Sequence, residues 1–171
     1  MSLSEFSLLK AASDLFLAGT ETTSTAIRWT LLYFLHYPEV QDKCYKEICD
    51  VIGTGRLPSF GDKANMTYLE ATTMEVLRAA NIAPLATYHA APHDITFRGH
   101  VIPKDAVILP NLDSVLQDPE IWGDPENFRP ERFIDPDGKV KRPEEFIPFG
   151  MGKYDSCDCC ARLDRNNQRN V

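Results

Sequence analysis

The chain of 171 residues carries a net charge of −7 at neutral pH, and its pI is near 5.1. This acidity, with no arginine-rich run before the last residues, argues against nucleic acid as a partner and favours small molecules. The five cysteines have no regular spacing, so we expect no disulfide framework and a reducing compartment. The first residues contain neither the basic nor the apolar segment of a secretory signal or membrane anchor, so we expect neither in the chain as given.

Residues 3–37 are predicted to form one long helix, because apolar residues recur at helical spacing and no proline interrupts them before Pro38. A helix of about 35 residues would be roughly 50 Å long, more than the width of a small domain. We therefore expect it to cross a domain much larger than this chain. Glu21, Arg28 and several threonines argue against a membrane span. The apolar stripe of this helix consists of Leu15, Leu31, Phe34 and Leu35.

The middle of this helix contains residues that are unfavourable in a helix interior. Gly19 costs on the order of 1 kcal/mol relative to alanine, and the hydroxyl residues that follow it compete for backbone hydrogen bonds. Ala18 and Gly19 add little bulk, so a flat partner could approach the backbone, while Glu21 and Thr22 set an acid beside an alcohol. Because such polar groups are costly within an apolar helix, this segment is the first candidate functional site.

A second helix is predicted to begin at Pro38 and to end at Gly53, and a polar loop over residues 54–65 follows it. Oppositely charged side chains at i,i+4 spacing should pair on its solvent-exposed side. These pairs are Glu39/Lys43, Asp42/Lys46 and Lys43/Glu47.

A third helix is predicted to begin at Thr67, because Thr67 and Glu70 have the spacing of a capping box, and to extend through Arg78. Within it, Glu75 and Arg78 lie three residues apart on one face. The spacing alone favours a solvent-exposed ion pair that stabilises the helix by a few tenths of a kcal/mol, about 0.2–0.5.

After Ala83 the pattern changes to short alternating segments that are typical of strands. Arg98-Gly99 and the turn at residues 103–105 separate them in the manner of hairpins. We therefore expect a mainly α fold with a small antiparallel β-sheet. The four predicted strands cover residues 87–90, 95–97, 100–102 and 106–109.

A short helix near residues 114–117 is expected to give way to a proline-rich segment that ends near Phe133. Prolines at this density argue against regular structure, so the aromatic residues Trp122, Phe128 and Phe133 must anchor an irregular coil to the core. Residues 135–138 should form a turn. The apolar run that follows enters a glycine-containing loop, a backbone suited to close approach to a ligand.

These segments, in this order, resemble the cytochrome P-450 family of haem-thiolate monooxygenases, and specifically its microsomal drug- and steroid-oxidising branch. The resemblance covers residues 14–153. It implies a partial fold of that family: the central helix, the helix with the E-x-x-R signature, the β region, the meander and the start of the haem loop. The motifs that carry it are Ala18-Gly19-Thr20-Glu21-Thr22-Thr23, Glu75-Val76-Leu77-Arg78, Pro130-Glu131-Arg132-Phe133 and Phe149-Gly150-Met151-Gly152.

The resemblance implies a role for each of these motifs. Glu21 and Thr22 would be the catalytic pair that orients water and relays protons. In place of an exposed ion pair, Glu75 and Arg78 would join Arg132 in a buried structural triad. The implied cofactor-binding residues are Ala18, Gly19, His89, Phe149, Gly150 and Gly152, and the implied substrate-pocket residues are Ile82, Ala83, Leu85 and Ala86.

The resemblance also implies the cofactor, the partners and the location. The cofactor would be haem, and electrons would come from NADPH through a reductase partner. The activity would insert one oxygen atom of O2 into a small lipophilic substrate, and nucleic acid would have no part in it. A full-length member would associate with the endoplasmic reticulum membrane on its cytoplasmic face, whereas the chain as written, without an anchor, would be cytoplasmic.

The last residues depart from the family pattern. Where the family has the arginine, the cysteine ligand and the last glycine of its haem loop, the chain has Tyr154, Ser156 and Asp158. The nearest sulfur, Cys157, lies one residue late and is the candidate iron ligand. We therefore expect residues 1–153 to form a partial monooxygenase domain and residues 154–171 an aberrant, disordered tail.

Two alternatives to an active monooxygenase remain open at this point. The truncated chain, which we expect to be inactive, could be a non-catalytic fragment that acts only through protein interaction. Cys157 and Cys160 could also form half of a small metal site, but no second C-x-x-C pair or nearby histidine accompanies them. Haem binding would separate the first of these alternatives from the monooxygenase.

Overall fold

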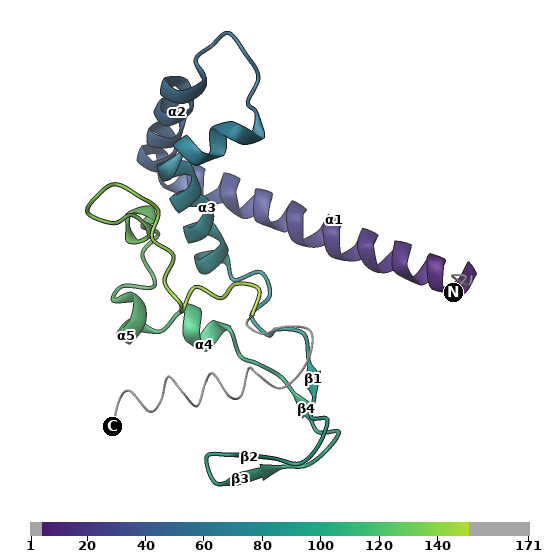
Figure 1. Ribbon diagram of the computed structural model, residues 1–171. Helices are drawn as coiled ribbons and strands as arrows, with labels where there is room; N and C mark the ends of the chain where they lie inside the picture. Colours follow the sequence, from purple (N-terminus) through teal and green to yellow (C-terminus); the bar gives the residue numbers. More distant parts are fainter. Residues whose placement is uncertain (1–4, 151–171) are drawn as a thin grey trace.

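The computed structural model describes residues 5–150. Figure 1 shows one long helix that projects from the remaining elements, with the β region at the opposite end from α2. The mainly α architecture with small antiparallel sheets confirms the predicted fold class. The helices are α1 (Glu5–His36), α2 (Pro38–Ile52), α3 (Thr67–Ala80), α4 (Asp113–Leu116) and α5 (Pro119–Trp122), with 3₁₀ helices η1 (Phe60–Asn65) and η2 (Pro130–Phe133).

The β region consists of two separate two-stranded sheets. Both are antiparallel, and both lie within the segments predicted to form strands. Arg98 and Gly99 have positive φ angles of 48° and 78°, the geometry of a type I′ turn, whose twist matches that of the flanking strands. The pairs are β1 (His89–Ala90) with β4 (Val107–Ile108), and β2 (Ile95–Phe97) with β3 (His100–Ile102).

Helix α1 continues without a break through its glycine- and hydroxyl-rich middle. The Thr22 hydroxyl donates to the Ala18 carbonyl at 2.6 Å, and the hydroxyls of Ser24 and Thr30 donate to carbonyls three or four residues back. Each hydroxyl is thus satisfied by a carbonyl of the preceding turn, so it does not compete for the backbone N–H groups. The predicted long helix is therefore confirmed within the described residues.

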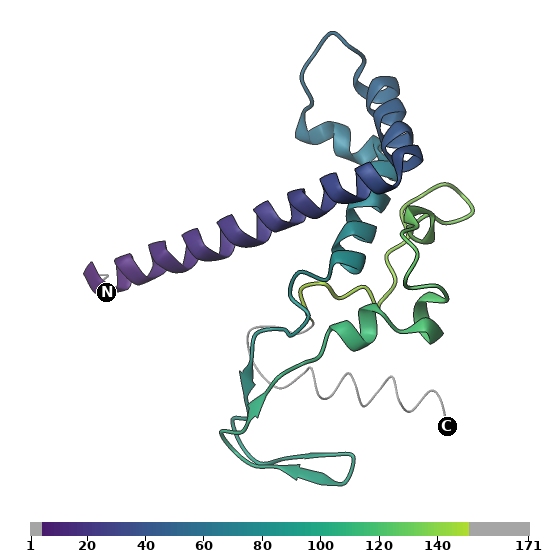
Figure 2. The ribbon, with the colours of Figure 1, turned by 180° about the vertical axis from the view of Figure 1, so that it is seen from behind.

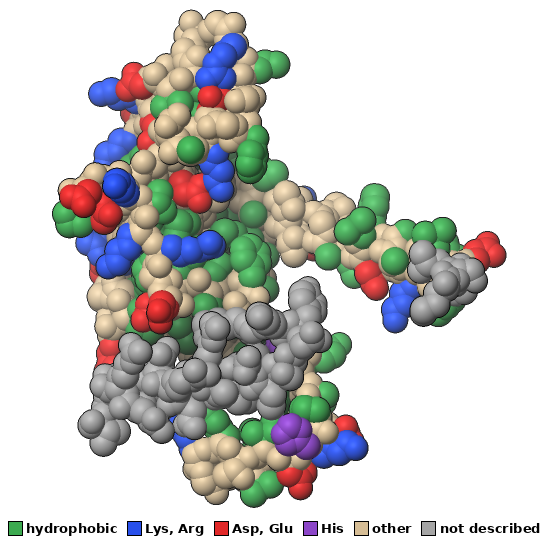
Figure 3. All heavy atoms as spheres, in the orientation of Figure 1, with side chains coloured by type: hydrophobic (Ala, Val, Ile, Leu, Met, Phe, Trp, Pro, Cys, Tyr) green, Lys and Arg blue, Asp and Glu red, His purple; other side chains and the backbone are tan. Residues whose placement is uncertain are grey.

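Most of the apolar side chains of α1 are exposed, and none of the residues of this helix is buried. Leu15 is 79% exposed and Leu35 81%, so this part of the predicted stripe packs on nothing in the described chain. The C-terminal end packs through Tyr33, whose ring stacks on Phe128 at 4.3 Å between centroids. Figures 1 and 2 show the N-terminal half extending away from the other elements, and Figure 3 shows hydrophobic side chains along it.

No helix in the stretch from residue 5 to residue 150 is both long and apolar enough to cross a membrane.

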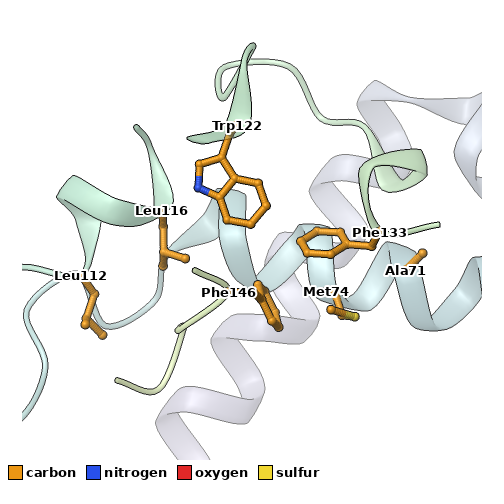
Figure 4. Close-up of a cluster of buried hydrophobic side chains, with 7 residues drawn as sticks. All are labelled: Ala71, Met74, Leu112, Leu116, Trp122, Phe133 and Phe146. Atoms are coloured by element: carbon orange, nitrogen blue, oxygen red, sulfur yellow. The ribbon is translucent and has the colours of Figure 1, made fainter. Parts of the chain in front are cut away.

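The main core forms where α3 meets the segments that follow the β region (Figure 4). Phe133 and Leu116 are fully buried, and Phe133 lies edge-on to Phe146 with 5.0 Å between ring centroids. Burial of this apolar surface holds α3, α4, α5 and η2 together. The cluster consists of Ala71, Met74, Leu112, Leu116, Trp122, Phe133 and Phe146.

The prediction that prolines leave the segment before Phe133 irregular is wrong at two places. Pro119 begins α5 and Pro130 begins η2. Proline fits the first position of a helix, where its missing N–H has no intrahelical partner to lose. Asp118 also caps α5, because its carboxylate accepts from the Glu120 N–H at 2.8 Å.

The predicted capping box at Thr67 and Glu70 is also wrong, because no side chain of the preceding residue caps α3. A carboxylate from α2 takes that place. Glu47 Oε1 accepts from the Tyr68 N–H and Glu47 Oε2 from the Leu69 N–H, each at 2.8 Å. These bonds satisfy two of the free donors at the helix N-terminus and place a negative charge beside its dipole.

The loop between α2 and α3 contains the capping box that the structure does form. Ser59 and Asp62 bond reciprocally at the start of η1, inside the segment predicted to be a loop. Along α2, Lys43 forms its ion pair with Glu131 of η2 at 2.7 Å, where an i,i+4 partner on α2 was predicted. Lys43 and Glu47 of α2 thus bridge to other elements.

We predict that Glu47→Ala lowers the free energy of unfolding by about 1–2 kcal/mol, the typical range for a lost N-terminal cap. The physical reason is the loss of both acceptors for the Tyr68 and Leu69 amides. Chemical denaturation of the haem-bound protein measures the change, and amide exchange at these two positions locates it. Asp50→Ala, an exposed carboxylate on the same helix, is the matched control, and an equal loss in both variants would contradict the prediction.

Candidate functional site

The Glu75 carboxylate on α3 lies at the centre of a buried polar cluster. Arg78, one turn later, donates from Nε to Oε2 at 2.8 Å and from Nη2 to Oε1 at 2.9 Å. Both side chains are 0% exposed. This paired, two-bond geometry is the strongest form of an arginine–carboxylate contact, and the two residues can form it because i and i+3 lie on one helix face.

Arg132 of η2 brings a second guanidinium to the same carboxylate, with Nε 3.1 Å from Glu75 Oε1. The Arg129 backbone N–H also donates to Oε1, at 2.9 Å. The interpretation of Glu75 and Arg78 as a solvent-exposed pair is therefore wrong. Arg129 and Arg132, which follow Glu75 by 54 and 57 positions in the sequence, cover the pair. The structure brings the three residues named by the resemblance into one buried cluster.

The guanidiniums also bind backbone carbonyls of the proline-rich segment and of the last residue of α4. Arg78 donates to two carbonyls at 2.8–2.9 Å, and Arg132 donates to three at 2.9–3.1 Å. Because that segment has few backbone ladders of its own, these arginines supply the partners that a sheet or helix would otherwise supply. The accepting carbonyls belong to Leu116, Trp122, Asp124, Pro125 and Asn127.

Trp122 lies against both guanidiniums, whose central carbons are 5.4 Å (Arg78) and 6.0 Å (Arg132) from its ring centroid. Its indole N–H donates to the Val115 carbonyl at 2.8 Å. The ring therefore joins the charged cluster to the apolar core of Figure 4. A desolvated cation–π contact of this kind contributes on the order of 1–2 kcal/mol.

Asp124 supplies a second negative charge at the edge of the cluster. Its carboxylate lies 2.7 Å from the Arg129 guanidinium and 3.3 Å from that of Arg132. Desolvation opposes its ionisation, but the two arginine charges outweigh that effect and hold the pKa of Asp124 below its ordinary value. Sequence reasoning missed this residue, which lies in the proline-rich segment predicted to be an irregular coil.

The proposed catalytic residues lie apart from this cluster, on the projecting part of α1 (Figures 1 and 2). Glu21 and Thr22 are both exposed, and so are Ala18 and Gly19. A Cβ added to Gly19 would meet no atom within 4 Å, so this face of the helix is open to a flat group. The Thr22 hydrogen is donated to the Ala18 carbonyl, which leaves the hydroxyl oxygen to accept.

Two segments that the sequence assigned to the pocket and to the haem loop do meet. A Cβ built on Gly150 would lie 3.9 Å from the Ala86 Cβ, and Gly150 has the positive φ of 80° that glycine adopts without strain. Its N–H donates to the Ile147 carbonyl at 2.9 Å. Phe149 is 79% exposed and Leu85 56%, so both present apolar surface to a partner.

Some of the other predicted site residues lie within residues 5–150, and the rest follow residue 150. Ile82 is half-buried, while Ala83 is exposed and His89 is an exposed residue of β1. Gly152, Ser156 and Cys157 lie outside the described residues, as do the predicted tail and the Cys157/Cys160 pair. Within residues 5–150, Cys44 and Cys49 are free thiols and no group of three or more His, Cys, Asp and Glu side chains could hold a metal.

Comparison with known proteins yields one family and a consistent set of relatives. A family model described as Cytochrome P450 matches residues 1–155. The chain is 49% identical to cytochrome P450 2U1 of Homo sapiens over 152 residues, which cover 89% of the chain and 28% of that protein. It is 45% identical to cytochrome P450 2E1 of Oryctolagus cuniculus over 82% of the chain and 29% of that protein. The chain thus spans under a third of the length of these relatives.

We predict that Glu75→Ala destabilises the folded protein by about 3–5 kcal/mol, because two buried guanidiniums would face each other without their shared carboxylate. Glu75→Gln, which keeps two polar atoms but no charge, should cost less. Chemical denaturation and haem content of the haem-bound protein measure the effect. Glu126→Ala, an exposed carboxylate close in sequence, is the control. Normal haem content and an unchanged unfolding midpoint in Glu75→Ala would show that the cluster is dispensable.

The stability of the folded protein should depend on pH in the acid range. The hydrogen bonds from Arg56 lower the pKa of Asp62, and the pKa of Asp124 also lies below its ordinary value of 3.8. A carboxyl whose pKa is lower in the folded state stabilises the protein above the unfolded-state pKa, and that contribution is lost as pH falls through the folded-state pKa. Stability should therefore decline progressively below about pH 4.

Denaturation midpoints measured from pH 6 down to pH 2 test this dependence. In Asp124→Asn the decline should be shallower, since one of the carboxyls with a lowered pKa is removed. Asp137→Asn, an exposed turn residue, should retain the full decline. Identical pH profiles for the parent protein and Asp124→Asn would contradict the assignment.

Proposed function

The chain belongs to the cytochrome P450 family, and from this premise we propose that its function is that of a haem-dependent monooxygenase, which inserts one oxygen atom of O2 into a small lipophilic substrate. The observation that carries the proposal is the acid–hydroxyl pair of Glu21 and Thr22 on an open, small-residue face of α1. Both side chains are exposed, and the Thr22 hydroxyl bonds to the Ala18 carbonyl of the same helix, so the pair is open to a bound group.

The described residues fit a large flat cofactor such as haem. Ala18 and Gly19 leave the backbone of α1 bare, and no neighbouring atom would occupy the space of a Gly19 Cβ. Phe149 and Gly150 begin a loop with exposed apolar surface, and His89 offers an exposed imidazole in β1 as a hydrogen-bond donor to a carboxylate. Together with Gly152, these residues would hold the group.

Haem, when bound, supplies an iron at which dioxygen can be activated, with a thiolate ligand favouring oxygen–oxygen cleavage. Cys157 is the candidate ligand, with Ser156 at the position where the family pattern has its cysteine. Among the described residues, those that could position water and exchange protons are on α1.

Thr22 would position water and Glu21 would exchange protons with it. The Thr22 hydroxyl donates to the Ala18 carbonyl at 2.6 Å, so its oxygen can accept a hydrogen bond from water above the bare surface at Gly19. A carboxylate at the next position can take up and release a proton. Delivery of a proton from Thr22 itself would require the hydroxyl to rotate away from the Ala18 carbonyl.

We extend the proposal to the substrate, the electron source and the location of the protein. Ile82, Ala83, Leu85 and Ala86 would line the substrate pocket with apolar side chains, which suits a lipophilic compound. Electrons would come from NADPH through a reductase partner. The membrane of the endoplasmic reticulum, on its cytoplasmic face, is the proposed location of the full-length protein.

The proposal predicts that Thr22→Ala, in a full catalytic domain that contains this segment and binds haem, lowers the product formed per NADPH consumed by roughly tenfold or more, the lower range for loss of a positioned proton-transfer group. The physical reason is that water loses its acceptor beside Glu21, so oxygen reduction proceeds without insertion. Product, NADPH and hydrogen peroxide measured in one assay give the coupling ratio.

Thr22→Ser should retain coupling, because it keeps the hydroxyl. Thr23→Ala, a truncation of an exposed threonine at the next position of the same helix, is the matched control. Unchanged coupling in Thr22→Ala, or an equal loss in Thr23→Ala, would remove Thr22 from the proposed proton path.

A further inference from the structure

The junction between α3 and the proposed pocket segment contains a side-chain pair that no motif assigned. Asn81 ends α3 in the left-handed conformation, with φ 40° and ψ 59°. Its Nδ2 donates to the Asp113 Oδ1 on α4 at 2.7 Å. Asparagine is one of the few residues other than glycine that adopt this conformation readily, so both the backbone and the side chain of Asn81 serve the junction.

The backbone beyond Asn81 is attached to the segment that contains Asp113. The Pro84 carbonyl accepts from the Leu112 N–H at 2.9 Å and from the Asp113 N–H at 3.2 Å. The Ala86 N–H donates to the Pro110 carbonyl at 3.1 Å. Residues 82–86 therefore follow a path that residues 110–113 fix on one side, and Asn81 sets the direction in which the chain leaves the helix.

The environment of Asn81 makes this contact selective for an amide. Its Oδ1 is buried and accepts no hydrogen bond from the described residues, whereas its Nδ2 meets a carboxylate oxygen. A carboxylate at position 81 would face Asp113 with like charge and would bury an unpaired charged oxygen, which is costly. A glycine would keep the backbone conformation but lose the bond.

We propose that Asn81 and Asp113 are positioning residues that fix the course of residues 82–86 and thereby the shape of the substrate pocket. This inference rests on the proposed function, because residues 82–86 are the proposed pocket lining. Neither residue touches the reacting atoms. Their effect is transmitted through the backbone bonds of Pro84 and Ala86 to the exposed side chain of Leu85.

The test compares Asn81→Gly, Asp113→Ala, Asn81→Asp and the exchange Asn81→Asp/Asp113→Asn in the haem-bound protein. Amide hydrogen exchange of peptides that contain Ala86 and Leu112 reports the clamp directly. The product distribution and KM for testosterone, a rigid lipophilic probe with many oxidisable carbons, report the pocket. Gln41→Ala, an exposed amide on α2, is the control.

In Asn81→Gly and Asp113→Ala, exchange at these amides should rise roughly three- to tenfold, the range expected for one lost hydrogen bond. The combination of these two changes should be no worse than either alone, since both remove one contact. Asn81→Asp should show the larger effect. The exchange variant should recover part of the protection and of the product pattern, because it removes the like-charge contact with position 113, while a charged oxygen at position 81 stays buried without a partner.

Unchanged amide exchange in Asn81→Gly and Asp113→Ala would overturn the clamp. Faster exchange with an unaltered product pattern and KM would overturn its role in the pocket and leave the monooxygenase intact. Absence of any oxidation by the parent protein would instead contradict the proposed function, and the amide exchange would then still decide whether Asn81 and Asp113 hold the segment.

Discussion

The buried carboxylate of Glu75 is the group on which the arrangement of the other elements depends. A charge at 0% exposure must be paired and fully hydrogen-bonded, because transfer from water to the protein interior is costly. Four hydrogen bonds meet that requirement: two from the Arg78 side chain one turn later on α3, one from the Arg132 side chain and one from the Arg129 backbone N–H. α3 and η2 are thereby joined at a fixed distance and orientation.

Arg78 and Arg132 also fix the proline-rich segment between α4 and η2, which has few regular backbone hydrogen bonds of its own. Prolines remove backbone donors between α4 and η2, and the guanidiniums bind four backbone carbonyls there and a fifth at Leu116, the last residue of α4. Trp122 then covers the guanidiniums with an apolar surface that continues into the core. Polar pairing and apolar burial support each other here, because each arginine contributes its charge to Glu75 and its flat face to the indole.

Much of the local structure follows from the sequence, for reasons that particular residues illustrate. The proline-free apolar periodicity before Pro38 predicts α1, and Gly53 marks the end of α2, because both signals act within one or two turns. Arg98-Gly99 predicts the β2–β3 turn, where both residues have positive φ. The same motifs identify Glu75, Arg78 and Arg132 through a family resemblance, whereas their spacing alone favours a solvent-exposed pair.

The sequence by itself determined the long helices, the strand segments, the fold class and the family, since these depend on local propensities and on short motifs, whereas it missed η1, α5 and η2. Only the tertiary structure decided the partners of the charged and capping side chains. Glu47 caps α3 from another helix, where the local pattern of Thr67 and Glu70 favoured a capping box. Asp124 and Asn81 gain their roles from residues at least five positions away. A hydrogen bond of this kind depends on the packing of separate elements in three dimensions, which spacing along the chain does not specify.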